Sequence, residues 1–106
     1  SLVEAGLREL EEETGFRSEE PAQLIGCVEP NPAIQTNQCG TLLIAGARLQ
    51  TAQNLDPNEE IEICLIPLQE VPDLIRRGEI TNSLVVAAFH HLHLHRSCES
   101  MKSTEV

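Results

Sequence analysis

The segment from Leu2 to Phe16 constrains the fold most, because it has the pattern of an amphipathic helix closed by a glycine. Apolar side chains and one threonine recur there at helical spacing and form a single stripe: Val3, Leu7, Leu10 and Thr14. Gly15 suits a left-handed C-cap, after which Phe16 can fold back onto the helix. We therefore expect a helix over Leu2–Thr14.

A second face of this helix is acidic. Glu9, Glu12 and Glu13 stand at i, i+3 and i+4, so their side chains emerge side by side. Like charges at i,i+4 destabilise a helix by about 0.2–0.5 kcal/mol per pair, and Arg8 is the sole cation between Ser1 and Phe16. A hard divalent cation, Mg²⁺ or Mn²⁺, would convert this repulsion into ligation by oxygen. The alternative interpretation is a solvated acidic helix face.

The string Arg-Glu-Leu-Glu-Glu-Glu-Thr-Gly-Phe at positions 8–16 resembles the second half of the Nudix box. This box is the signature of hydrolases that act on nucleoside diphosphates linked to another moiety. Seven of the nine positions match the family's pattern: Arg8, Glu9, Leu10, Glu12, Glu13, Gly15 and Phe16. The Gly and the isolated Glu that begin the box, and the strands ahead of it, would fall before Ser1. We expect residues 1–96 to form a partial Nudix domain and residues 97–106 a flexible tail.

The remaining chain reads as alternating strands and helices. Apolar or alternating runs predict three strands: Gln23–Glu29, Thr41–Leu49 as a central strand, and Glu59–Leu68. A polar loop is expected over residues 30–40. Two helices follow, a short one over Val71–Arg77 stopped by Gly78 and a longer one over Leu84–His95 capped by Asn82 or Ser83. With the resemblance, this order implies an α/β fold, a Nudix-type mixed sheet sandwiched between helices and lacking its N-terminal strands.

The C-terminal half resembles the ADP-ribose pyrophosphatase branch of the Nudix hydrolases. The resemblance rests on Glu59-Glu60-Ile61-Glu62-Ile63, a short helix, Gly78-Glu79-Ile80, and an apolar helix ending in Leu-His. It implies Mg²⁺- or Mn²⁺-dependent hydrolysis of ADP-ribose, or a related nucleoside diphosphate sugar, to a nucleoside monophosphate and a sugar phosphate. It also implies a homodimer.

The resemblance assigns roles to individual residues. Glu9 and Glu13 are the strongest metal-ligand candidates, with Glu12 close behind as a ligand and catalytic residue. Arg8 is implied to be a structural partner of an acidic residue in the box. Glu59 falls where the branch carries its general base, and the neighbouring Glu60 is the alternative. A catalytically incomplete Nudix fragment that acts as a nucleotide-binding or regulatory module is the rival interpretation of the whole chain.

Composition narrows the partners and the compartment. A net charge of −10 argues against nucleic acid or an anionic membrane as partner, and no apolar stretch approaches the length of a membrane span. The four cysteines fit no zinc pattern. Cys27 and Cys64 lie in apolar runs, where we expect them to be buried and reduced, which favours a cytoplasmic location.

Four histidines crowd the last predicted helix. His91 and His95 stand at i,i+4 and could together ligate a transition metal. We expect no carboxylate or third ligand to stand near them, and the rest of this helix has a core-packing pattern. We therefore expect His90, His91, His93 and His95 to lie on a helix surface, where a position near the C-terminus also suits the helix dipole.

Overall fold

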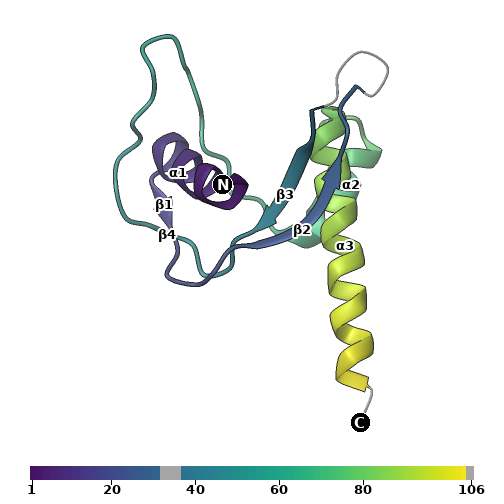
Figure 1. Ribbon diagram of the computed structural model, residues 1–106. Helices are drawn as coiled ribbons and strands as arrows, with labels where there is room; N and C mark the ends of the chain where they lie inside the picture. The colour runs from purple at the N-terminus through teal and green to yellow at the C-terminus, as the bar shows by residue number, and fades with distance from the viewer. Residues whose placement is uncertain (32–36, 105–106) are drawn as a thin grey trace. The chain divides into compact units, whose positions relative to one another are not determined.

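The computed structural model describes residues 1–31 and 37–104, with side chains through residue 100. These residues form a mixed α/β structure of short strands and helices (Figure 1). The elements, in chain order, are α1 (Leu2–Thr14), β1 (Phe16–Arg17), β2 (Gln23–Val28), β3 (Cys39–Leu43), β4 (Arg48–Leu49), the 3-10 helix η1 (Leu68–Glu70), α2 (Val71–Arg76) and α3 (Ser83–Thr104). The α/β composition predicted from the sequence is confirmed, and most of the polar loop predicted over residues 30–40 lies outside the described residues.

Helix α1 has the bounds predicted for it, and both of its ends are capped. At the N-terminus the Ser1 hydroxyl accepts a hydrogen bond from the Glu4 main-chain N–H at 3.2 Å, in a capping box. At the C-terminus Gly15 adopts φ 78°, and its N–H donates to the Glu11 carbonyl at 2.8 Å. The left-handed glycine cap predicted from the sequence is therefore confirmed.

Four strands pair into two small sheets within the described residues. Strands β1 and β4 are antiparallel, with Phe16 opposite Leu49, and β2 pairs with β3. The predicted strand Gln23–Glu29 is confirmed as β2. The predicted central strand Thr41–Leu49 is wrong in extent, because the chain turns at Gly46, which has φ 69°. That turn divides the apolar run between β3 and β4.

The predicted strand Glu59–Leu68 is also wrong. Residues 59–67 form no strand, although their alternation from Glu60 to Leu65 has the period of one. A strand needs a hydrogen-bonded neighbour, and neither bond that the structure describes to this segment's main-chain carbonyls comes from a strand: the Gln53 side-chain amide donates to Ile61 at 3.2 Å, and the Glu70 N–H donates to Pro67 at 3.0 Å. Pro57 and Pro67 bound the segment, and each lacks an N–H to donate.

Helices α2 and α3 follow the predicted order. Helix α2 ends just before Arg77, and Gly78 follows with φ 79°. The Asn82 side-chain oxygen accepts from the Leu84 N–H at 2.9 Å and the Val85 N–H at 3.3 Å, so Asn82 caps α3. The predicted end of this helix near His95 is wrong, because α3 continues to Thr104. The flexibility expected of residues 97–106 stays a prediction, and residues 105–106 lie outside the described part.

The described chain divides into two compact units that interleave in sequence. The first comprises Ser1–Leu24 and Leu42–Leu65, and the second comprises Ile25–Thr41 and Ile66–Val106. The first contains α1, β1, β4 and the irregular segment after β4, and the second contains α2 and α3. The chain passes between the units within β2, within β3 and between Leu65 and Ile66.

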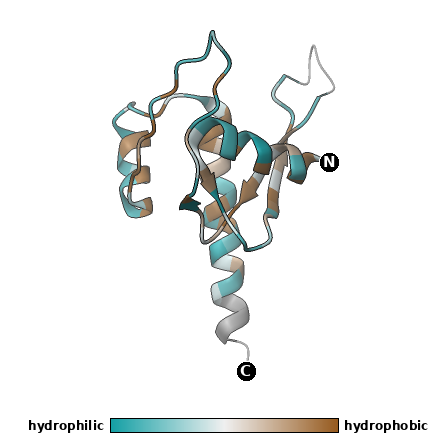
Figure 2. Cartoon of the chain, turned by 90° about the vertical axis from the view of Figure 1, so that its left-hand side faces the viewer, coloured by the Kyte–Doolittle hydropathy of each residue, from teal (hydrophilic) through white to brown (hydrophobic). Residues whose placement is uncertain are grey.

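Little of the described chain is fully buried. Val71, 4% exposed, is the one described hydrophobic residue that is buried, whereas Leu49 and Leu65 are 65% and 77% exposed. Figure 2 shows hydrophilic and hydrophobic residues interspersed along the chain. The prediction that Cys27 and Cys64 are buried is wrong: both are exposed, and all four cysteines are free thiols. No described helix has the length and apolar character needed to cross a membrane.

Candidate functional site

The acidic face of α1 lies in the first unit. Glu9 is exposed, whereas Glu12 and Glu13 are half-buried. Arg8 Nε lies 4.0 Å from Glu12 Oε1, an i,i+4 pair in which both side chains are substantially exposed. The resemblance implied that Arg8 pairs with an acidic residue, and the structure contains such a pair. An exposed pair of this kind contributes at most about 1 kcal/mol.

The segment after β4 lies against the C-terminal end of α1 (Figure 1). The Asn54 N–H donates to the Glu12 carbonyl at 2.7 Å, and the Gln53 side-chain amide donates to the Glu13 carbonyl at 2.7 Å. The Gly15 carbonyl accepts hydrogen bonds from the N–H groups of Gln50 and Thr51, at 2.9 and 3.1 Å. The last carbonyls of a helix have no partner within it. Residues 50–54 therefore complete the C-terminus of α1.

Glu59 closes a tight turn in the same segment. Its N–H donates to the Asp56 carbonyl at 2.9 Å, and its Oε1 accepts from the Asp56 N–H at 3.0 Å. The main-chain bond is that of a β-turn with Pro57 at its second position, and the bond from the Asp56 N–H to the Glu59 carboxylate matches one half of a capping box. One carboxylate oxygen of Glu59 is thus used by the turn, and Oε2 has no hydrogen bond within the described residues. Glu60, the next residue and the alternative base, is exposed.

The structure brings the predicted site residues into one unit without closing a metal cage around them. Glu9, Glu12, Glu13 and Glu59 all belong to the first unit. Across the described residues, however, no group of three or more His, Cys, Asp or Glu side chains is arranged so as to hold a metal ion. The donor chemistry fits Mg²⁺, which prefers oxygen ligands and is commonly held by only one or two carboxylates.

Gln53 is a residue of the site that sequence reasoning missed. Its side-chain amide bridges the carbonyls of Glu13 and Ile61, and so joins α1 to the segment that carries Glu59. The sequence held only a weak signal for this role, a polar residue in a stretch expected to be a loop. Loop residues that satisfy helix ends leave no periodic pattern.

The histidines divide between surface and packing roles. His90 and His93 are exposed and stacked, with ring centroids 6.3 Å apart, which confirms the surface prediction for these two. His91 is half-buried, and its ring occupies the space where a Cβ on Gly26 would lie. His95 Nε2 lies 3.3 Å from Glu99 Oε1, so the expectation that no carboxylate stands near these histidines is wrong. The predicted surface position is therefore wrong for His91, whose ring packs against β2.

Comparison with known proteins assigns no family to this chain. No protein-family model matches it, and no curated protein matches it. The function must therefore be argued from the site itself. That site consists of a glycine-capped acidic helix and a second acidic turn, joined by main-chain and side-chain hydrogen bonds.

Proposed function

We propose that this chain is part of a Mg²⁺-dependent hydrolase that cleaves the pyrophosphate of ADP-ribose or a related nucleoside diphosphate sugar. A Nudix-type arrangement, with a mixed sheet between helices, belongs to this proposal, as do a homodimer and a cytoplasmic location. The observation that carries it is the hydrogen bonding of residues 53 and 54 to the carbonyls of Glu12 and Glu13. Through these bonds the segment that bears Glu59 is fixed to the acidic helix.

The residues divide the chemistry as follows. Glu9 and Glu13, one helical turn apart, would hold the Mg²⁺ ion, with Glu12 beside them. When bound, Mg²⁺ neutralises charge on the phosphates and lowers the pKa of a bound water. Glu59 accepts a proton from the attacking water at Oε2, while Oε1 stays bonded to the Asp56 N–H. The water oxygen forms a bond to one phosphorus as the bond between that phosphorus and the bridging oxygen breaks, which gives a nucleoside monophosphate and a sugar phosphate.

The test is hydrolysis of ADP-ribose by the purified chain, with and without Mg²⁺, followed by separation of the products. We expect a nucleoside monophosphate and a sugar phosphate in equal amounts, and only when Mg²⁺ is present. Binding of ADP-ribose without turnover would replace the hydrolase with the rival function, a nucleotide-binding module. That rival has an observation in its favour, since Glu59 already serves the turn at Asp56. Failure to bind ADP-ribose at all would overturn both.

A further inference from the structure

The second unit contains a cleft between α2 and α3 that the proposed hydrolase does not use. It encloses about 470 Å³, within the roughly 300–1,000 Å³ typical of small-molecule sites. Figure 1 shows α2 lying beside α3. Leu68 and Gln69 of η1 also line the cleft. Apolar side chains from both helices line its interior, among them Val71, Ile75, Val86 and Phe89. These side chains can pack against the apolar part of a ligand.

The polar side chains of this cleft include a cation, Arg96, and no acid. His90, His93 and Arg96 are spaced three residues apart and so follow one face of α3, and all three line the cleft and are exposed. No residue that lines the cleft is Asp or Glu, although the chain has 17 acidic residues and a net charge of −10. A cleft with an arginine, two imidazoles that can donate hydrogen bonds and no carboxylate favours an anion.

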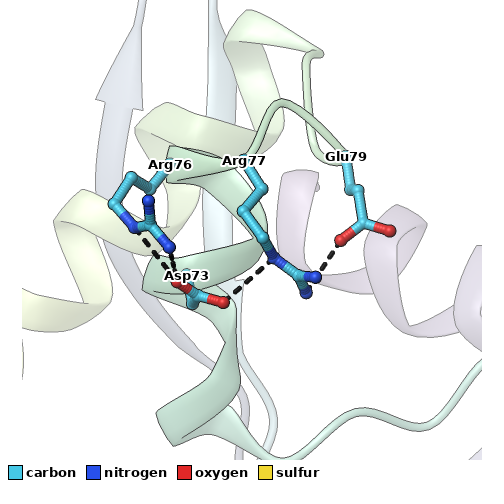
Figure 3. A network of polar contacts seen from close by, with 4 residues as sticks. All are labelled: Asp73, Arg76, Arg77 and Glu79. Carbon is cyan, nitrogen blue, oxygen red and sulfur yellow. Dashed lines mark hydrogen bonds and ion pairs between the residues drawn. The ribbon is translucent and has the colours of Figure 1, made fainter.

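Arg96 differs from Arg76 and Arg77 at the end of α2, because both of these form ion pairs with acidic side chains. Figure 3 shows Asp73 between Arg76 and Arg77, with Arg77 also paired to Glu79. The Arg77–Asp73 and Arg77–Glu79 distances are 3.0 and 2.8 Å. Arg96, by contrast, makes no ion pair with any residue that the structure describes. Its guanidinium is thus available for a ligand carboxylate or phosphate, which it can bind through two parallel hydrogen bonds.

We propose that the α2–α3 cleft binds a small amphipathic anion, with an apolar body against Val71, Ile75 and Phe89 and an acidic head at Arg96. The two stacked imidazoles of His90 and His93 lie on the same face and donate further hydrogen bonds to that head. Apolar contact supplies most of the binding energy, and the Arg96 guanidinium selects anionic over neutral ligands of the same length. The ligand class is that of an aliphatic or aromatic carboxylate.

The test uses decanoate as the probe, with decanol as its neutral counterpart, each titrated into the ¹⁵N-labelled full chain while amide NMR signals are followed. We expect saturable shifts at the cleft residues, and about tenfold tighter binding of decanoate than of decanol. Arg96→Gln should remove that preference. Arg76→Gln, an identical change of charge on α2 outside the cleft, should retain it.

Three outcomes would overturn the proposal. Decanol binding as tightly as decanoate would show that Arg96 plays no part in ligand selection. Equal weakening by the Arg96 and Arg76 variants would reduce the effect to net charge. Shifts at the cleft that follow protein concentration without any probe would assign the cleft to a second copy of the chain. Val86→Phe supplies an independent check, because it fills the cleft from α3 and should abolish binding while thermal unfolding is unchanged.

Discussion

The side-chain amide of Gln53 donates a hydrogen bond to the carbonyl of Glu13, 40 residues away in sequence, at 2.7 Å. The same amide nitrogen donates to Ile61, two residues after Glu59, at 3.2 Å. One side chain thus links the acidic helix to the segment with the proposed base. The bond satisfies a helix-terminal carbonyl and fixes the position of an acidic turn, so structure and proposed function depend on the same contact.

Replacing Gln53 with alanine should loosen this link. Two hydrogen bonds are lost, each worth about 0.5–1.5 kcal/mol net, and because Gln53 is exposed we expect the free energy of unfolding to fall by about 1 kcal/mol. Amide exchange at Asn54, whose N–H donates to Glu12, should accelerate. Gln50→Ala is the matched control, since the Gln50 side chain makes no hydrogen bond within the described residues. Equal urea midpoints for the two variants would contradict this role.

Replacing Glu13 with glutamine should abolish Mg²⁺-dependent turnover and leave stability nearly unchanged. The Glu13 side chain has no ion pair within the described residues, and the hydrogen bond from Gln53 reaches its main-chain carbonyl. Glutamine therefore removes a charged ligand and preserves the helix. Glu62→Gln makes the same change of charge at an exposed position outside the site and should keep wild-type turnover. A parallel loss of turnover and thermal stability in Glu13→Gln would show that Glu13 is structural.

Glu59 allows its two roles to be separated. Glu59→Gln keeps an oxygen that can accept from the Asp56 N–H, so the turn should survive while kcat falls and metal affinity stays. Glu59→Ala removes both the proton acceptor and the turn contact, and should also lower stability by about 0.5–1.5 kcal/mol, the net contribution of one hydrogen bond. Steady-state kinetics and thermal unfolding distinguish the variants. Wild-type kcat in Glu59→Gln would move the base to another residue, Glu60 first.

Two glycines with the same backbone conformation provide a test of the α1 cap. Gly15 and Gly78 have φ 78° and 79°, but a Cβ on Gly15 would collide with the Thr51 carbonyl oxygen, whereas one on Gly78 would meet nothing within 4 Å. Gly78→Ala should cost about 1–2 kcal/mol from the left-handed conformation alone. Gly15→Ala should cost about 1–3 kcal/mol more from overpacking. Similar denaturant midpoints for both variants would mean that the segment from Thr51 onward moves away freely.

Local sequence signals predicted the helices well. The bounds of α1 followed from its apolar stripe and Gly15, and the cap of α3 followed from the chemistry of Asn82, because helix periodicity and capping are encoded within a few neighbouring residues. The end of α3 was missed because polar residues after His95 lack an apolar stripe, and a stripe is not required for helical hydrogen bonds. Glu59–Leu68 failed for the opposite reason, since alternation alone does not provide a pairing strand.

The site could be predicted only in part. Glu9, Glu12 and Glu13 are predicted as metal ligands because their spacing and the resemblance coincide on one helix, and that role stays a prediction. The attachment of the Glu59 segment to α1 was not predictable, because it depends on hydrogen bonds from Gln53 and Asn54 to carbonyls far away in sequence. Main-chain acceptors at a helix end are the same for every residue type, so they leave no trace in the sequence.

The proposed metal site on α1 is tested most directly by recording which amide NMR signals Mn²⁺ broadens at substoichiometric amounts. Mn²⁺ prefers the same oxygen ligands as Mg²⁺, so a single bound ion reports which carboxylates surround it. We expect the signals of Glu9, Glu12, Glu13 and Glu59 to broaden first, and excess Mg²⁺ to restore them. Broadening confined to the histidines of α3, with α1 and Glu59 unaffected, would contradict a metal site on the acidic helix.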